Sequence, residues 1–315
     1  MIVTPVERAT VQGVATPRPS RARQAITALV VFGPLAGAIV AAVTLFREQA
    51  TAADLVIAAA FYVVTGHGLT AGYHRMCTHR AFRARRVMKV VLVLAGSLAF
   101  EGGVLGWSAS HRRHHAYTDV EGDPHSPHLS GTSPAGQLRG LLHAHLGWLF
   151  RPPLEERERW IPDLLADRDL VLLDRLFPLW CLASFALPAV AGLAVTGNAA
   201  GALGGFLWGG LVRVFLLQQS TFAVNSACHL WGSRPFRTRR DDEARNFAPL
   251  ALFAFGDNWH NLHHSLPRLA RHGVDRHEWD STARLIAVLE RLSLVSEVRW
   301  PNAALLESRR VLHVG

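Results

Sequence analysis

Lysine and cysteine are scarce in this sequence of 315 residues. Lys89 is the only lysine, so the formal net charge of +9 comes from arginine, and no basic run alternates with aromatic residues as on many nucleic-acid-binding surfaces. The three cysteines, Cys77, Cys181 and Cys228, are odd in number and widely spaced, which argues against a disulfide framework and against a paired-cysteine metal site. We therefore expect no nucleic-acid partner and no structural disulfide.

Charged residues are also few, at 18% of the chain, while hydrophobic residues make up 50%. Four long apolar stretches predict membrane-spanning helices, because at 1.5 Å per residue the first is about long enough to cross a bilayer core. Short segments join the first to the second and the third to the fourth, so the four form two hairpins. They are residues 25–46, 55–72, 176–195 and 199–217. A fifth stretch, 87–107, contains Lys89 and Glu101 and is assigned neither to a span nor to the surface.

The distribution of arginine predicts the orientation in the membrane. Arg47 is the only basic residue in the two short connecting segments, whereas arginines gather at 18–23, 80–86 and 234–240. Because positive charge is enriched on the cytoplasmic side, both termini and the polar segment 111–175 should face the cytoplasm. We expect residues 1–22 to form a disordered cytoplasmic tail and residues 23–310 to form one domain of an integral protein of a bacterial cell membrane.

Histidine carries the strongest functional signal, because nine of the 17 histidines fall into four compact groups. HRMCTH and NSACH lie where the second and the last spans emerge on the cytoplasmic side, and HRRHH and HNLHH lie in polar segments. The nine are His74, His79, His111, His114, His115, His229, His260, His263 and His264. An HxxHH spacing places three imidazoles on one face of a helix, so two such groups suit two metals. HxxxxH turns about 140° on a regular helix, so that pair should lie on either side of the site.

The number of histidines also bears on the identity of the metal. Neutral imidazole binds Fe, Zn, Cu and Ni, so affinity alone does not choose among them. A catalytic zinc ion needs about three protein ligands and a water, and nine clustered histidines exceed that requirement. Histidine at the membrane interface is costly unless it is satisfied, which makes these residues functional candidates. The pattern favours a dinuclear redox centre.

In order along the chain, HRMCTHRAF, HRRHH, NSACHLWG and GDNWHNLHHSLP resemble the histidine boxes of the membrane fatty-acid desaturases, and most of all the stearoyl-CoA Δ9 branch. The resemblance covers roughly residues 64–300 and includes GDPHSP after the second box and ARHG after the third. It implies an all-α desaturase domain in which about four transmembrane helices lie beneath a cytoplasmic helical cap. It also implies two iron ions (Fe2+/Fe3+) held by the nine histidines, a water-mediated iron contact from Asn225, and O2 as co-substrate.

The sequence departs from the family pattern in places that concern its partners. Ala109 and Ser110 stand where the animal enzymes carry an Arg-Asp pair that helps to hold acyl-CoA, which leaves the acyl carrier open. Asp257 and Asn258 replace a pair such as Glu-Gly that is common in bacterial relatives. The sequence has no cytochrome b5 domain, so we expect a separate electron donor, ferredoxin-like or cytochrome b5-like, with its reductase.

Several further residues are candidates for supporting roles. Asp119, Asp123 and Asp257 should accept ring N–H groups from the metal-binding histidines, although solvated loop charges would give the same pattern. A second set of residues is predicted to line an acyl tunnel, and the alternatives are a histidine satisfied in the core and tryptophans at the membrane interface. That set is His67, Trp148 and Trp259.

The function predicted from these features is O2-dependent insertion of a cis double bond into a long-chain fatty acyl thioester, with acyl-CoA and a Δ9-like position as the first expectation. A hydroxylase, ketolase or alkane monooxygenase on the same scaffold is the alternative, and the mass of the product decides between them. An ion transporter would carry its histidines along the spans, whereas here they gather at the cytoplasmic ends.

Overall fold

The computed structural model describes residues 19–47, 49–152 and 156–311. Residues 1–18 of the predicted tail lie outside this range, and the first helix begins at Arg21, with the Ser20 hydroxyl accepting a hydrogen bond from the Arg23 N–H. The described residues are mainly helical, and their one sheet has two strands of two residues each. The prediction of an all-α fold is therefore confirmed.

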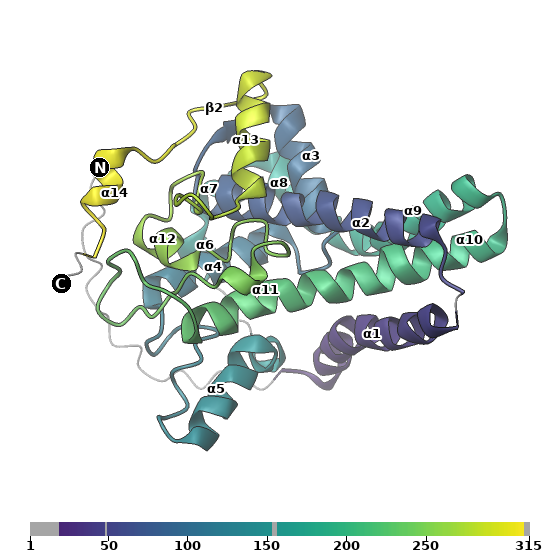
Figure 1. Ribbon diagram of the computed structural model, residues 1–315, viewed down its shortest axis with the longest axis horizontal. Coiled ribbons are helices and arrows are strands. Elements are labelled where there is room, and N and C mark those ends of the chain that lie inside the picture. Colours follow the sequence, from purple (N-terminus) through teal and green to yellow (C-terminus); the bar gives the residue numbers. More distant parts are fainter. Residues whose placement is uncertain (1–18, 48, 153–155, 312–315) are drawn as a thin grey trace.

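Within the described residues, four helices are long and apolar enough to cross a membrane, which confirms the four predicted spans. The first is α1 (Arg21–Phe46) and the third is α9 (Phe177–Thr196). The second joins α2 (Ala52–His67) to a π-helix, η1 (Gly68–Thr78). The fourth joins α10 (Ala199–Gly204), the π-helix η3 (Gly205–Val212) and α11 (Arg213–Leu230). In Figure 1 the loops from α1 to α2 and from α9 to α10 lie at the same end of the elongated molecule.

The unassigned stretch 87–107 does not form a fifth span. Helix α3 (Arg86–Ser97) has 12 residues, which at 1.5 Å per residue is about 18 Å and shorter than a bilayer core. It ends in a turn before α4 (Val104–Tyr117). Helix α3 packs closely on η1, because a Cβ atom on Gly68 would lie 2.2 Å from the main-chain nitrogen of Gly96. Small residues at this contact let the two helices approach each other.

Short helices and loops make up the cap at the other end of the molecule. In the part of the chain that the structure describes, five short helices lie between α4 and the third span, α9. They are α5 (Pro134–His145), η2 (Gly147–Phe150), α6 (Arg157–Trp160), α7 (Pro162–Leu165) and α8 (Arg168–Arg175). After α11 come η4 (Ala248–Leu250), α12 (His260–Ser265), α13 (Ser281–Arg291) and α14 (Ala303–Glu307). Strand β1 (Arg83–Ala84) pairs antiparallel with β2 (Val295–Ser296), with Arg83 opposite Ser296. Helices α4 and α12 lie at the end away from the two short loops (Figure 1).

A buried arginine joins the fourth span to its neighbours. The Arg213 side chain is fully buried and donates to the carbonyl oxygens of Gly209, Leu98 and Ser184. These acceptors come from η3, from the end of α3 and from α9. The charge is therefore satisfied by main-chain dipoles, which is how a guanidinium can be buried in an apolar region.

Candidate metal centre

The HxxxxH pair lies at the end of a π-helix, and this changes the geometry expected from a regular helix. The His79 N–H donates to the His74 carbonyl oxygen at 3.1 Å, five residues back along the chain. The wider π turn brings residues five apart next to each other, so the two ring centroids are 4.9 Å apart. The sequence argument assumed an α-helical turn of about 140° between the two residues, whereas the π turn places the rings next to each other; that the pair lies on either side of a metal stays a prediction.

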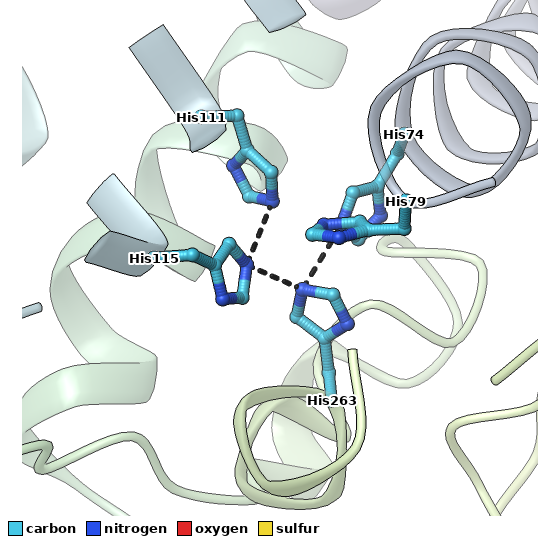
Figure 2. A group of neighbouring side chains, drawn as sticks. All are labelled: His74, His79, His111, His115 and His263. Atoms are coloured by element: carbon cyan, nitrogen blue, oxygen red, sulfur yellow. Dashed lines mark hydrogen bonds between the residues drawn. The ribbon is translucent and has the colours of Figure 1, made fainter. Parts of the chain in front are cut away.

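The structure brings all nine candidate histidines together in two groups. Within each group, one ligand atom from every residue lies within 4.8 Å of the others. The five-histidine group comprises His74, His79, His111, His115 and His263 (Figure 2). The four-histidine group comprises His114, His229, His260 and His264.

Each HxxHH box is divided between the two groups. Helix α4 gives His111 and His115 to the five-histidine group and His114 to the other. Helix α12 does the reverse, because His260 and His264 lie in the four-histidine group and His263 in the five-histidine group. On an α-helix the residues i and i+4 are about 40° apart, whereas i+3 lies about 60° to the other side of i. One turn can therefore present imidazoles to two neighbouring sites.

The distances between ring nitrogens match those of ligands on one metal ion. The His115 Nε2 lies 3.1 Å from that of His111 and 2.9 Å from that of His263, and dashed lines mark both contacts in Figure 2. In the other group the His264 Nε2 lies 3.0 Å from that of His260. Two nitrogens that each lie about 2.1 Å from a metal, at right angles to each other, are about 3.0 Å apart. The residues present thus fit a metal ion in each group.

The protonation of the rings also calls for a cation. The Nδ1 atoms of His114 and His264 lie 3.0 Å from the carboxylates of Asp123 and Asp242, to which they donate. A neutral ring with its proton on Nδ1 has a lone pair on Nε2, and these two Nε2 atoms face each other at 3.3 Å. Burial and the neighbouring imidazoles hold the pKa of His264 well below its ordinary value, so that this ring is neutral. A metal ion between the two lone pairs would turn their repulsion into ligation.

The three predicted carboxylates each lie against one of these histidines. Asp119 accepts from the His229 Nδ1 at 2.9 Å, and Asp257 accepts from the His74 Nδ1 at 2.8 Å, as Asp123 does from His114. Burial alone would raise the pKa of Asp119, but the interaction with the His229 ring outweighs it and holds the pKa below its ordinary value. Each carboxylate therefore fixes the proton on Nδ1 and leaves Nε2 free to bind metal.

Sequence reasoning missed other residues at this centre. Asp242 was not singled out, since its place in a charged loop gave no sign of His264. His272 is fully buried, with its ring centroid 4.5 Å from that of His263 and its Nδ1 3.4 Å from the Asp257 carboxylate. It belongs to the ARHG segment, which was the available signal. Outside this centre, Glu101 is partly buried between α3 and α4, and burial raises its pKa to about 8.

The remaining candidates lie outside the two groups. Asn225 is in α11, one turn before His229, and its contact with iron through water stays a prediction. Both ring nitrogens of His67 have partners, the Val63 carbonyl oxygen at 2.9 Å and the Ser281 hydroxyl at 3.2 Å, as expected of a satisfied histidine. The Trp259 Nε1 donates to the Trp279 carbonyl oxygen. The Trp148 ring lies 5.3 Å from that of His125. A tunnel lined by His67, Trp148 and Trp259 stays a prediction.

Replacing Asp242 with asparagine should weaken metal binding by about 10- to 100-fold, because the amide keeps an acceptor for the His264 N–H but removes the charge that makes the ring a better ligand. The measurement is iron retention during titration with a chelator. The control is Asp169→Asn, which removes a surface carboxylate paired with Arg86. Equal iron retention in the two variants would contradict the role given to Asp242.

Comparison with known proteins supplies the family. A family model described as fatty acid desaturase matches residues 50–285. The chain is 34% identical over 280 residues to a hex-5-enoyl-(acyl-carrier protein) acetylenase of Moorena producens, an alignment that covers 88% of this chain and 87% of the relative. It is also 34% identical over 240 residues to an sn-2 palmitoyl-lipid 9-desaturase of Nostoc, covering 73% of this chain and 76% of the relative.

A third relative is longer than this chain. The identity to a probable acyl-CoA desaturase of Schizosaccharomyces pombe is 34% over 245 residues, which is 76% of this chain but 48% of that protein. The names of the three relatives differ in the acyl carrier and agree in chemistry that removes hydrogen from an acyl chain. Since the family model matches most of the sequence and a relative of 34% identity is covered over 87% of its length, the chain belongs to the fatty acid desaturase family.

Proposed function

We propose that this protein is an O2-dependent desaturase that inserts a cis double bond into a long-chain fatty acyl thioester. The observation that carries the proposal is the convergence of nine imidazoles into two adjoining groups whose nitrogens are spaced as metal ligands. Family membership supports an oxidoreductase of the membrane. The names of the relatives support an acyl chain as the substrate.

Two iron ions are proposed as the cofactor, one in the five-histidine group and one in the four-histidine group. Asn225 is proposed to contact the iron of the four-histidine group through a water molecule. When bound, the irons supply the oxidising power that no side chain has, using O2 and two electrons. In the net reaction the acyl chain loses two hydrogens and becomes an alkene. Those two hydrogens combine with O2, two electrons and two protons to give two water molecules. The electrons come from a separate donor protein.

The protein's own residues hold the ligands in one orientation. Asp119, Asp123 and Asp257 keep a proton on the Nδ1 of His229, His114 and His74, which directs each Nε2 into its group. The Trp107 ring stacks on His111 at a centroid distance of 5.0 Å and limits its rotation. Rigid placement of this kind lets a bound chain present only certain carbons to the centre.

We further propose that the desaturase domain extends over residues 23–310 and that the metal groups face the cytoplasm of a bacterial cell. The arginine-rich segments beside the apolar helices support this orientation. Acyl-CoA and a Δ9-like position are the first candidates for the substrate. The Moorena relative, named for a chain on acyl carrier protein, and the Ala109–Ser110 departure support a carrier protein as the second thioester to test.

The experiment uses the full chain purified in detergent, loaded with iron and supplied with O2 and a reductant. Stearoyl-CoA and stearoyl acyl carrier protein are offered separately, and the recovered chains are analysed by mass spectrometry. We expect a product that has lost two hydrogens from at least one thioester. A product that has gained oxygen would support the hydroxylase alternative. Saturated chains recovered unchanged from iron-loaded protein would contradict the proposal.

A further inference from the structure

Four arginines line a hollow on the surface of the cap. The hollow has a volume of about 130 Å³ and is lined by Arg80, Phe82, Arg83, Arg268, Glu297 and Arg299. We call it the arginine hollow. Four positive charges against one negative charge give it a net charge of +3 when only these lining residues are counted.

Main-chain hydrogen bonds hold the walls of the arginine hollow in place. The Arg299 N–H donates to the Ala81 carbonyl oxygen at 2.9 Å, and the Arg299 carbonyl oxygen accepts from the Ala270 N–H at 2.9 Å. The pairing of β1 with β2 adds a second tie between the same parts of the chain. Segments that follow the first histidine box, the third histidine box and β2 therefore meet at this point, so the arrangement of the arginines is set by the backbone.

The charge of the hollow is only partly neutralised within the protein. Arg80 pairs with Asp163, but that carboxylate is also bound by Arg112 at 2.6 Å. Among the residues that the structure describes, Arg268 and Arg299 form no ion pair. Burial, together with the nearby guanidinium groups of Arg299 and Arg80, lowers the pKa of Arg268. Arg83 pairs with Glu297 at 3.1 Å, so the positive charge left over is that of Arg268 and Arg299. Positive groups without counter-charges attract an anionic partner.

The hollow is also close to the candidate metal centre along the chain. Arg80 follows His79 directly, so one peptide bond links a wall of the hollow to the five-histidine group. The Arg80 N–H donates to the Met76 carbonyl oxygen at 3.2 Å, which ties this residue to η1. A molecule seated on the hollow is therefore connected to the metal group through a short and rigid part of the backbone.

We propose that the arginine hollow is the docking site of a small acidic electron-transfer protein, which passes electrons to the five-histidine group past Arg80. The inference rests on the proposed function, because only a redox centre needs such a donor. In each docking event the donor's own metal centre loses one electron and an iron of the group goes from Fe3+ to Fe2+, with no bond made or broken. Two such events supply the two electrons of one turnover.

The size of the hollow favours an electron donor over an acyl carrier protein, which is also acidic. Pockets that enclose small-molecule ligands measure about 300 to 1,000 Å³, whereas this hollow is about 130 Å³. It can receive carboxylate side chains of a partner but cannot enclose a long acyl chain. A donor needs only contact at this surface, while a carrier must deliver its chain into the protein.

The test is a charge reversal, Arg268→Glu with Arg299→Glu, with a plant-type [2Fe–2S] ferredoxin as the probe. We expect the ferredoxin concentration that gives half of the maximal desaturation rate to rise at least about tenfold, because steering between opposite charges is lost, and the salt dependence of the rate to weaken. With dithionite as a small chemical reductant, the variant should match the unmodified protein. The matched control is Arg276→Glu with Arg309→Glu, which makes the same change in charge at two other exposed arginines and should keep the original ferredoxin dependence.

Three results would overturn the docking proposal: an unchanged ferredoxin dependence in the variant, an equal change in the control, or an equal loss of rate with dithionite. Binding of ferredoxin and of acyl carrier protein is also measured directly. Loss of carrier-protein binding alone in the variant would assign the hollow to the carrier instead and overturn the proposal. The proposed function fails if the unmodified protein forms no alkene even with dithionite. In that case, weaker ferredoxin binding by the variant than by the unmodified protein would still support the docking proposal.

Discussion

We expect two double variants to lose one iron each and to keep the other. Each removes one histidine from each of the two HxxHH boxes, and we call them the box-crossing variants. The first, His111→Ala with His263→Ala, removes two residues of the five-histidine group, one from α4 and one from α12. The second, His114→Ala with His264→Ala, removes two residues of the four-histidine group from the same two helices. Because each variant leaves the other group complete, we expect one iron per chain instead of two. Iron is counted by elemental analysis of the purified protein.

The same variants test whether the metals follow boxes or spatial groups. If each HxxHH box held its own metal, either variant would weaken both sites, and iron would be lost from both. The structure predicts that each affects one site and that the two variants retain different irons, which Mössbauer spectra can distinguish. Both should lose desaturation by at least about 10³-fold, since loss of several kcal/mol of metal assistance corresponds to such a factor.

A matched double substitution controls for the loss of two imidazoles as such. His143→Ala with His277→Ala changes two histidines outside both groups and should keep both irons and most of the activity. Loss of both irons from each box-crossing variant, with the control intact, would show that the two groups are not separate sites.

Local patterns in the sequence were enough to predict the spans and the nine histidines. Hydropathy located the spans because a membrane-crossing helix such as α1 is apolar over most of its length, here after its first turn. The histidines were recognisable because HxxHH is a pattern within a single helical turn, as it proves to be in α4 and α12. The stretch 87–107 was ambiguous because α3 is apolar but too short to span a bilayer. Its apolar residues serve its packing on η1.

Contacts between distant parts of the chain could not be predicted in this way. The division of each box between two groups depends on how α4 and α12 face each other, which no spacing specifies. Asp242 meets His264 across 22 residues, and His272 meets Asp257 from the other end of α12, which lies between them in the chain. The π-helix that joins His74 to His79 depends on an i to i+5 hydrogen bond, for which the sequence had no separate signal.

Arg75→Met should destabilise the protein more than Arg213→Met, although both guanidinium groups are fully buried. Arg75 lies 3.0 Å from the Asp280 carboxylate and 3.1 Å from the Asp257 carboxylate. Its removal leaves the buried Asp280 carboxylate and the partly buried Asp257 carboxylate without this cation, for which we expect a loss of about 3 to 5 kcal/mol in the free energy of unfolding. The measurement is denaturant or thermal unfolding in detergent.

Arg213 is the matched control, because its acceptors are neutral. The carbonyl oxygen of Gly209 lies within a helix, and that of Leu98 also accepts from the Ser184 hydroxyl. The carbonyl oxygen of Ser184 loses its donor with the arginine, because the residue four positions on is Pro188, which has no N–H. Loss of the arginine therefore leaves no buried charge, and we expect about 1 to 3 kcal/mol. Adding Asp280→Asn to Arg75→Met should restore part of the stability, since it removes one of the two unpaired charges.

Iron retention separates the two arginines further. Asp257 is shared between Arg75 and the His74 ring, so that Arg75 fixes the carboxylate that orients a residue of the five-histidine group. Its NH1 also donates to the Ala270 carbonyl oxygen at 2.7 Å, which ties η1 to the segment after the third box. Arg75→Met should therefore lose stability and iron together, whereas Arg213→Met should lose only stability. Equal iron retention in the two variants would mean that Arg75 serves the fold alone.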